Sequence, residues 1–496
     1  MRVWLRLLLV VALVAYARWF VPLLAPYAGS ADSSGYIWSA QLFARGQLAE
    51  PLRRPTGAPP SLPADAFAPL GTLVRSNRTE LVPSYPTGLP LLLALGLIAA
   101  PLDTGLAAVV LVAALTTLWL TYRLGRAAGL DRLWSVVPAA LLGCSPLFVF
   151  SGQQVMSDVP STSLALGVVL LAWRARRRPS SAIWAGAVLG LATLVRPTNI
   201  VFAAPLVAAV GLSFPLLWRV AIGGIPFAIF LLVYQLTLFG SPFSTGYGDV
   251  RSAFATSSLA PTLRHYATWL PSLFSWLIVG APAGWWLWRG PHRTWQGISA
   301  AWVAGVFALY AAYFHTAETW WYLRFILPAM PPMLVATARA GQRALELALP
   351  RAPARTVVAC SAVAALLVAW LVPRALLRHP LVEVYRATRV NEGEYRSALR
   401  WFAIHHRVER PVLMVQLGGA ARVYTPELLT VRFDRLSTEH WQALRAWQQR
   451  SGTTVDAALL PFEEPEFLAA AAEGRLACRW ELRDAYHAVH FWECAP

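Results

Sequence analysis

The chain has 496 residues, of which 57% are hydrophobic and only 14% are charged. Soluble globular proteins carry about 25% charged residues, so most of this chain does not face water. Basic residues number 42, all of them arginine, against 25 acidic residues, and the formal net charge is +17. The arginines lie in short clusters between apolar stretches, which is typical of membrane sidedness. The composition therefore excludes a soluble globular protein, and the clustering argues against a nucleic-acid surface.

Charge divides the chain into two parts. From Arg374 to Pro496 there are 16 arginines and 15 acids, a balance typical of a soluble domain, whereas the acids are scarce before Pro373. We therefore expect a membrane domain over 1–373 and a soluble domain over 374–496. Four cysteines are too few for a disulfide scaffold.

Apolar runs predict the membrane crossings, since a spanning helix needs about 20 mostly apolar residues. The segment 88–101 is short and contains Pro90, so we expect it to be re-entrant and not to cross. We expect a polytopic, mainly α-helical bundle of about 11–13 membrane helices, with the clearest candidates at 3–24, 105–122, 133–150, 158–173, 182–195, 199–217, 220–239, 268–288, 295–314, 325–338 and 356–373.

The positive-inside rule orients these helices. With the N-terminus in the cytoplasm and 88–101 re-entrant, the arginine clusters, such as the one that contains Arg174 and Arg177, fall on the cytoplasmic side. Most acids of the membrane part then fall outside, on two long outer loops at 26–87 and 240–267 and at helix ends. The soluble domain is also placed outside. Compact loops and the exclusive use of arginine favour a bacterial inner membrane.

The segment after residue 381 alternates helical and strand patterns and predicts a small α/β domain. We expect helices at Glu394–Arg407, Thr438–Arg450 and Phe467–Ala472, and strands at Val412–Gln416, Val455–Leu460, Leu476–Leu482 and Ala488–Glu493. Cys478 lies on the third of these strands and Cys494 directly follows the fourth, so in adjacent strands the two cysteines are able to pair if the compartment is oxidising.

Two carboxylates stand out because acids are rare in the membrane part. Asp32 follows the first apolar helix and precedes a short amphipathic segment suited to the bilayer interface. Asp158 directly precedes an apolar helix, with Pro160 two residues later. Each also has a plain structural interpretation, because Asp is a common residue at a helix start. Both fall on the outer side in a topology derived from arginines alone, which strengthens the functional interpretation.

Two arginines break the sidedness rule by flanking apolar runs on the outer face. These are Arg196 and Arg324. Placing arginine near hydrocarbon costs free energy, so such a residue is usually paired or functional. A guanidinium binds phosphate through bidentate hydrogen bonds. The alternative is that both side chains extend to the interface. His315 precedes an aromatic run and is either a substrate-binding residue or part of an interfacial aromatic belt.

Several short motifs occur in a recognisable order along residues 1–340. Glu80 and Tyr247 lie near two of them. The motifs are Asp32-Ser33-Ser34-Gly35-Tyr36, Ser84-Tyr85-Pro86-Thr87-Gly88-Leu89-Pro90, Ser157-Asp158-Val159-Pro160, Leu194-Val195-Arg196-Pro197-Thr198, Phe239-Gly240-Ser241-Pro242 and Arg324-Phe325-Ile326-Leu327-Pro328. In this order they resemble the GT-C glycosyltransferases that use polyprenyl-phosphate sugars, the protein mannosyltransferase and lipid A aminoarabinose transferase group.

The resemblance implies a multi-helix fold with an outward-facing active site and direct, inverting sugar transfer. It implies that Asp32 and Asp158 are catalytic. Many members carry Asp-Glu in the first outer loop, whereas Ser33 follows Asp32 here, so a second first-loop carboxylate is unassigned and Glu80 is a substitute. We expect Arg196 and Arg324 to hold the departing phosphate, with Tyr247 and His315 as further substrate-binding candidates.

The implied partners are a polyprenyl-phosphate-linked sugar and an acceptor of unknown kind, within the lipid bilayer. The histidines show no metal-ligand spacing, so the cofactor is unknown and a divalent metal stays open. The alternative function is a lipid-linked glycan transporter or flippase, although neither paired half-helices nor two related halves are visible.

Overall fold

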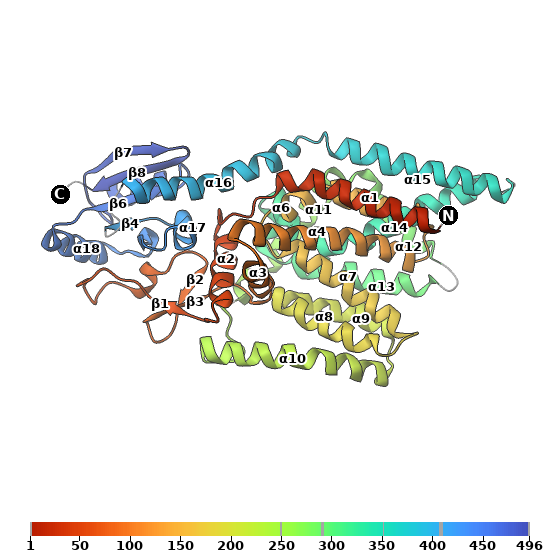
Figure 1. Ribbon diagram of the computed structural model, residues 1–496, viewed down its shortest axis with the longest axis horizontal. Coiled ribbons are helices and arrows are strands. Elements are labelled where there is room, and N and C mark those ends of the chain that lie inside the picture. The colour runs from red at the N-terminus through yellow and green to blue at the C-terminus, as the bar shows by residue number, and fades with distance from the viewer. Residues whose placement is uncertain (1, 249, 289–291, 351, 406–409, 495–496) are drawn as a thin grey trace. The chain divides into compact units, whose positions relative to one another are not determined.

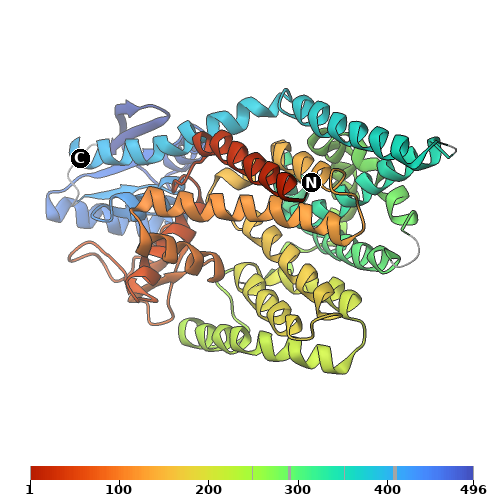
Figure 2. The same ribbon diagram turned by 45° about the vertical axis from the view of Figure 1, so that its right-hand side comes forward.

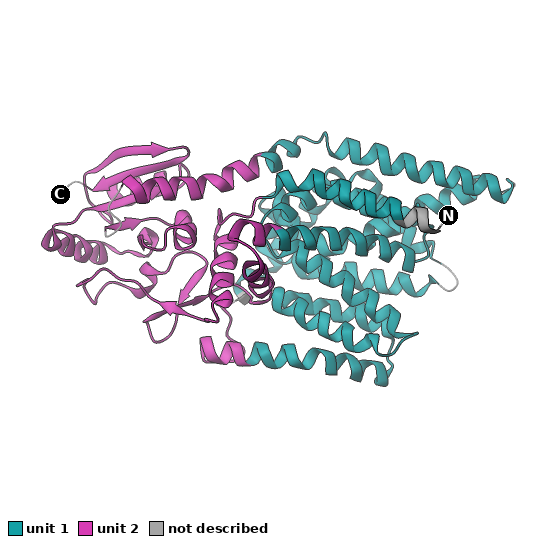
Figure 3. Ribbon diagram, in the orientation of Figure 1, with its two compact units in different colours: residues 1–24, 108–232, 249–386 teal, residues 25–107, 233–248, 387–496 magenta. Residues whose placement is uncertain are grey.

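The computed structural model describes residues 2–248, 250–288, 292–350, 352–405 and 410–494 (Figure 1). The chain divides into two compact units, and each unit is assembled from three separate stretches (Figure 3). Unit 1 comprises 1–24, 108–232 and 249–386, and unit 2 comprises 25–107, 233–248 and 387–496. The first outer loop predicted from the sequence therefore belongs to the same unit as the C-terminal residues.

Unit 1 is built from helices. The α7–α8 pair forms an antiparallel hairpin whose helices lie side by side in both views (Figures 1 and 2). The helices that lie wholly or mainly in this unit are α1 (Arg2–Phe20), α4 (Leu102–Ala127), α5 (Val136–Cys144), α6 (Pro146–Gln153), α7 (Asp158–Ala175), α8 (Ser181–Val195), α9 (Ala203–Val210), α10 (Phe214–Phe239), α11 (Leu259–Phe274), α12 (Ala281–Trp286), α13 (Thr294–Ala311), α14 (Met330–Ala348) and α15 (Ala354–Leu376). Short 3-10 helices include η3 (Pro197–Phe202), η6 (Trp276–Gly280), η8 (Phe314–Ala317) and η9 (Trp320–Ala329).

Three of the described helices, α4, α10 and α15, are long and apolar enough to cross a membrane. The α10 and α15 helices expose isoleucine, valine and leucine side chains along much of their length. Exposed apolar surface of this extent is typical of contact with lipid. The prediction of a polytopic helical membrane protein is supported, and the number of crossings stays a prediction.

Several predicted spans are interrupted in the structure, among them 133–150, 199–217 and 268–288. The segment 133–150 forms α5 and α6, which meet at an angle of 67° at Ser145, directly before Pro146. Pro146 has no N–H to donate, so it starts a new helix more readily than it continues one. The segment 268–288 is likewise divided among α11, η6 and α12.

Small residues allow α8 and α10 to approach closely. A Cβ atom built on Gly186 would lie 1.9 Å from the carbonyl oxygen of Val220, and one on Gly223 would lie 1.9 Å from that of Ile183. Backbone contact of this kind requires glycine on both helices, as is common in membrane helix pairs. The α8–α10 pair is therefore held by dispersion between closely packed backbones.

Unit 2 contains two sheets and the helices around them. Its helices are α2 (Ala31–Ala44), α3 (Gly88–Ala99), most of α16 (Leu381–His405), α17 (Gln416–Tyr424), α18 (Thr438–Ser451) and α19 (Glu464–Ala472). The small sheet has the order β1-β3-β2 and is antiparallel, with β1 at Glu50–Pro51, β2 at Thr72–Val74 and β3 at Glu80–Pro83. The large sheet has the order β5-β4-β6-β8-β7, with strands at Pro411–Leu413 (β4), Leu429–Val431 (β5), Val455–Leu459 (β6), Trp480–Tyr486 (β7) and Val489–Cys494 (β8).

The large sheet is mixed. Its parallel pairs are β4 with β5 and β4 with β6, whereas β8 is antiparallel to both β6 and β7. All five residues of β6 are buried, as expected for a central strand covered on both faces. The tail is thus a small α/β fold, in agreement with the sequence-based prediction.

The hydrophobic core beneath this sheet includes residues from the first outer loop. Leu62, Ala66 and Phe67 are buried in the same cluster as Trp441 and Phe467. The backbone N–H of Arg432 also donates to the carbonyl of Ala66 at 2.7 Å. Residues separated by more than 350 positions therefore share one core, which explains why the loop and the tail form one unit.

Cys478 and Cys494 form a disulfide in the described structure. Cys494 lies on β8 opposite Trp480 of β7, and the two cysteines are 16 positions apart. The bond closes the end of the β7–β8 hairpin and requires an oxidising compartment to form. The placement of the tail outside the cytoplasm stays a prediction.

Loss of this disulfide is expected to destabilise the tail. In Cys478→Ser, the free energy of unfolding should fall by about 3 kcal/mol, the loop-closure value for a loop of about 15 residues. Chemical denaturation of the purified full chain without reductant measures the change. Cys360→Ser is the matched control, because Cys360 is a free cysteine on α15. Equal stability of the two variants would contradict the expectation.

Candidate functional site

Asp158 is the first residue of α7 and is almost completely buried, with 1% of its surface exposed. The N-terminus of a helix favours a negative charge, and Pro160 follows in the first turn, where its missing N–H costs nothing. The hydroxyl of Thr162 donates to the Asp158 carbonyl at 2.8 Å, which fixes the turn. A buried carboxylate requires a charged partner, and the structure supplies two.

Arg196 is the closer partner of Asp158. Its Nη2 lies 2.6 Å from Oδ1 of Asp158 and also donates to Oγ of Ser157 at 2.9 Å. Arg196 has extended backbone and directly follows α8, at the point where Pro197 starts η3. The side chain is 12% exposed, so the pair is largely shielded from water.

Asn199 fixes the turn that carries Arg196. Its amide group donates to the carbonyl of Ala192 at 2.7 Å, and its Oδ1 accepts from the hydroxyl of Ser161 at 2.8 Å. These bonds tie the end of α8 to the first turn of α7. Sequence analysis did not single out Asn199, although it stands within the Arg196-Pro197-Thr198-Asn199 segment.

Arg324 approaches Asp158 from a third element. It lies on η9, and its Nε is 3.9 Å from Oδ2 of Asp158. Its guanidinium also lies 5.4 Å from the ring centre of Phe325 and 5.5 Å from that of Tyr322. Arg196 lies 5.5 Å from the ring centre of Phe325, so one aromatic ring contacts both cations. We call Asp158, Arg196 and Arg324 the cationic cluster, because it brings two guanidinium groups to the carboxylate of Asp158.

Aromatic side chains connect this cluster to His315. The Tyr322 ring stacks between Phe325 and His315, with centroid separations of 5.8 and 5.4 Å. His315 also forms an ion pair with Glu318 at 2.7 Å when it is protonated. The structure therefore brings four of the predicted residues, Asp158, Arg196, Arg324 and His315, into one region of unit 1.

Asp32 lies in unit 2, in the first turn of α2. The helix is capped by Ser30, whose side chain accepts from the backbone N–H of Ser33, so the interpretation of Asp32 as the capping residue is wrong. Gly35, one turn later, faces Tyr85, and a Cβ atom there would lie 2.4 Å from the ring. The glycine thus lets Tyr85 pack directly on the helix that carries Asp32.

Tyr247 belongs to the same aromatic group as α2. Tyr85 lies 4.9 Å from Tyr36 and 5.9 Å from Tyr247 between ring centres. Tyr247 is 49% exposed, which leaves part of its ring accessible to a ligand. Tyr247 is therefore linked through Tyr85 to Tyr36, which lies one turn after Asp32 on α2.

Glu80 is held away from this group by an ion pair. It lies on β3, accepts from Nη1 of Arg75 at 2.8 Å and accepts from the Asn77 amide at 2.9 Å. The hydrogen bond from Arg75 lowers the pKa of Glu80 below its usual value. The carboxylate is thus engaged within the β2–β3 hairpin, and the structure gives no support to its use as a second first-loop acid.

A different carboxylate approaches the first loop. Glu392 on α16 accepts the backbone N–H of Gly29, three residues before Asp32. The hydroxyl of Tyr424 accepts the neighbouring N–H of Ala28 at 2.8 Å, and α17 packs against α2. The tail thus fixes the segment that carries Asp32. Sequence analysis missed Glu392 because it occupies an ordinary polar helix 360 positions away from Asp32.

Burial raises the pKa of Glu392 to about 7. Because the folded state favours the protonated form, its stabilising contribution is greatest below about pH 4.5 and is lost as the pH rises to about 7. The slope for one group is at most about 1.4 kcal/mol per pH unit. We therefore expect Glu392→Gln to unfold at a higher temperature than the unmodified protein at pH 8, but not at pH 4.5.

Thermal unfolding of the purified full chain across this pH range measures the difference. Glu394→Gln is the matched control, since Glu394 lies on the same helix and faces His487 at 3.9 Å. If the unfolding temperature of Glu392→Gln runs parallel to that of the unmodified protein across this pH range, the raised pKa of Glu392 is contradicted.

Within the described ranges, no three His, Cys, Asp or Glu side chains are arranged to hold a metal ion. The charges in unit 1 that face Asp158 are guanidinium groups, which repel a cation and attract an anion. The donor set at the cationic cluster therefore fits a phosphate and does not fit a metal.

Comparison with known proteins supports the fold. No protein-family model matches the chain, and no curated protein matches it by sequence. Solved structures do match it. ArnT from Cupriavidus metallidurans, solved with bound undecaprenyl phosphate, has a TM-score of 0.57 at 14% identity, and the match covers 98% of this chain and 97% of ArnT.

Two further structures match over most of the chain. The arabinofuranosyltransferase AftD from Mycobacteria has a TM-score of 0.56 at 14% identity, covering all of this chain and 40% of AftD. The oligosaccharyltransferase of Archaeoglobus fulgidus has a TM-score of 0.53 at 12% identity, covering 95% of this chain and 72% of that protein. All are GT-C glycosyltransferases, and identities this low establish the fold alone. The resemblance expected from the ordered motifs is confirmed at this level: the chain has the fold of the GT-C glycosyltransferase superfamily.

Proposed function

We propose that this protein is an integral membrane glycosyltransferase that moves one sugar from a polyprenyl-phosphate donor to an extracytoplasmic acceptor, with inversion. The acceptor is a lipid, a glycan or a protein. The observation that carries the proposal is the cationic cluster, in which the guanidinium groups of Arg196 and Arg324 both face the buried carboxylate of Asp158. Two guanidinium groups held together at a shielded position are suited to binding an anion, and the donor phosphate is one.

Within this proposal, the two arginines bind the phosphate and stabilise the charge that develops on it as the sugar departs. Asp158 acts on them as a positioning residue, because its carboxylate is 1% exposed and faces both guanidinium groups. The aromatic contacts of Phe325 and Tyr322 further restrict the orientation of the arginines. Preorganised charge of this kind needs no rearrangement during the reaction.

Asp32 is the proposed general base. The acceptor hydroxyl oxygen attacks the anomeric carbon, its proton moves to the Asp32 carboxylate, and the bond from that carbon to the phosphate oxygen breaks. The bonding electrons leave with the phosphate, so free polyprenyl phosphate is the second product. A single displacement inverts the anomeric carbon. Protonation of the leaving group is unnecessary because a phosphate is already a good leaving group.

The proposed activity is tested by incubating the purified protein with a panel of polyprenyl-phosphate hexoses and pentoses together with envelope lipid and glycan acceptors. We expect one donor to release free polyprenyl phosphate in step with glycosylated acceptor. A transporter would instead move the intact donor between the leaflets of a proteoliposome. Translocation without any release of polyprenyl phosphate would reject the glycosyltransferase.

A further inference from the structure

A second basic site lies at the opposite end of α7 from the cationic cluster. It is a cavity of about 570 Å³ between the last turns of α4 and α7. Asp158 begins α7 and Arg174 stands close to its end. Asp158 and Arg174 are 16 positions apart, which corresponds to about 24 Å along the helix at 1.5 Å per residue. This cavity is therefore distinct from the cationic cluster, and one phosphate group cannot occupy both.

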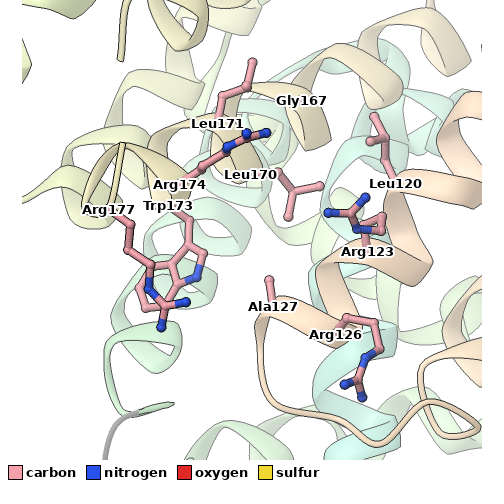
Figure 4. A pocket seen from close by; sticks show the side chains of 10 residues that line it. All are labelled: Leu120, Arg123, Arg126, Ala127, Gly167, Leu170, Leu171, Trp173, Arg174 and Arg177. Atoms are coloured by element: carbon pink, nitrogen blue, oxygen red, sulfur yellow. The ribbon is translucent and has the colours of Figure 1, made fainter. Parts of the chain in front are cut away.

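The walls of the cavity are amphiphilic. The apolar wall consists of Leu120 and Ala127 of α4 and Gly167, Leu170 and Leu171 of α7. The indole of Trp173 adds an aromatic face. Four arginines complete the lining, namely Arg123, Arg126, Arg174 and Arg177, and none of the ten lining residues is acidic. Figure 4 shows Arg123 and Arg174 extending toward the space between the two helices.

These arginines are poorly neutralised by the protein. Arg126 donates to the carbonyl of Leu130, and Arg123 lies 5.8 Å from the ring centre of Trp119. No carboxylate among the described residues forms an ion pair with any of the four. By contrast, Arg176, next to Trp173 in the same segment, stacks on that ring at 4.8 Å and donates to the carbonyl of Ala209. Arginines that only mark the cytoplasmic side need not converge on one hollow.

We propose that this cavity is a binding site for an anionic phospholipid of the cytoplasmic leaflet, with its phosphate between the guanidinium groups of Arg123 and Arg174 (Figure 4), Arg126 and Arg177 at the basic rim, and its acyl chains against the leucines. The combination of basic rim and apolar wall fits an amphiphile better than a free phosphate, and basic pockets between membrane helices on the cytoplasmic side are suited to anionic lipid head groups. The volume lies within the range of ordinary ligand sites. The inference does not depend on the proposed transferase activity.

The test uses the purified full chain in detergent and native mass spectrometry. Phosphatidylglycerol, phosphatidylcholine, undecaprenyl phosphate and inorganic phosphate are titrated separately. Phosphatidylglycerol should bind at least tenfold more tightly than phosphatidylcholine. In Arg174→Gln/Arg177→Gln, its affinity should fall by about 30-fold, since each arginine near an anionic lipid contributes about fivefold.

The matched control is Arg132→Gln/Arg178→Gln, which removes the same charge from residues that do not line the cavity. We expect the control to bind phosphatidylglycerol as the unmodified protein does. An equal loss of phosphatidylglycerol affinity in both double variants would indicate general electrostatic attraction to the surface and would contradict a specific site. Equal affinity for phosphatidylglycerol and phosphatidylcholine would also overturn the proposed site, and so would displacement of phosphatidylglycerol by millimolar inorganic phosphate. The same holds if Arg174→Gln/Arg177→Gln loses affinity for undecaprenyl phosphate alone.

Discussion

Replacement of Arg196 by alanine is expected to lower kcat/KM for sugar transfer by about 10²- to 10³-fold, the usual effect of removing one preorganised donor from a developing negative charge. Arg196 makes the shorter of the two contacts to Asp158, at 2.6 Å. Its loss removes half of the guanidinium groups of the cationic cluster. Initial rates of polyprenyl-phosphate release measure the change.

The same substitution also leaves a buried carboxylate without its closest partner, which costs about 3–5 kcal/mol of stability. The double variant Arg196→Ala/Asp158→Asn separates the two effects, because it removes both charges together. We expect this variant to recover most of the lost stability and none of the lost activity. Arg386→Ala is the control for the loss of a guanidinium, since Arg386 pairs with Glu383 on an exposed surface. Recovery of activity in the double variant would mean that Arg196 acts only in folding.

Replacement of Asp32 by asparagine is expected to reduce the transfer rate by about 10²- to 10⁴-fold, the range typical for loss of a general base. The amide is similar in size and Ser30 caps the helix independently, so α2 should remain folded. Donor binding should be unchanged, because the phosphate is held by other residues in this account. The loss should therefore appear in kcat and not in KM.

Asp65→Asn is the matched control, because Asp65 is a carboxylate in the same first outer loop but lies in the short helix at Ala64–Phe67. This variant should retain full activity. A fully active Asp32→Asn protein would reject the base assignment, and equal losses in both variants would point to the charge of the loop as a whole.

The parts of the site visible in the sequence were those that violate a general rule. Arg196 and Arg324 stood out because arginine is costly on the outer side of a membrane helix, and Asp158 because acids are rare in this part of the chain. Their mutual contacts require three elements, α7, the end of α8 and η9, to meet at one point. No local sequence pattern predicts that these three elements meet. The sequence therefore predicts the residues, and only the structure shows their ion pairs.

The tail shows the same division between local and distant information. The helix at Thr438–Ser451 and the strand at Val455–Leu459 were predicted almost to the residue, because their apolar spacing is regular. By contrast, α17 and β5 were missed. The α17 helix is nine residues long and contains Gly418 and Gly419, which weaken its local helix signal. The predicted strand Val412–Gln416 includes the first residue of α17, and the predicted helix Glu394–Arg407 extends past His405 into residues outside the described ranges.

Glu80 and Glu392 show that contacts between residues far apart in the sequence determine which carboxylate approaches the segment before Asp32. Glu80 is the predicted substitute for a second carboxylate because it shares the first outer loop with Asp32, yet it is engaged by Arg75 and Asn77 of its own hairpin. Glu392 reaches the backbone just before Asp32 from the other end of the chain. Only the packing of α16 and α17 on the first loop brings this carboxylate to that place.

The most direct test of the account is whether the cationic cluster binds the phosphate of the lipid carrier. Native mass spectrometry of the purified protein with undecaprenyl phosphate should detect one bound molecule. The affinity should fall at least tenfold in Arg196→Ala/Asp158→Asn and stay unchanged in Arg174→Gln/Arg177→Gln. Undiminished binding to a folded Arg196→Ala/Asp158→Asn variant would contradict the account.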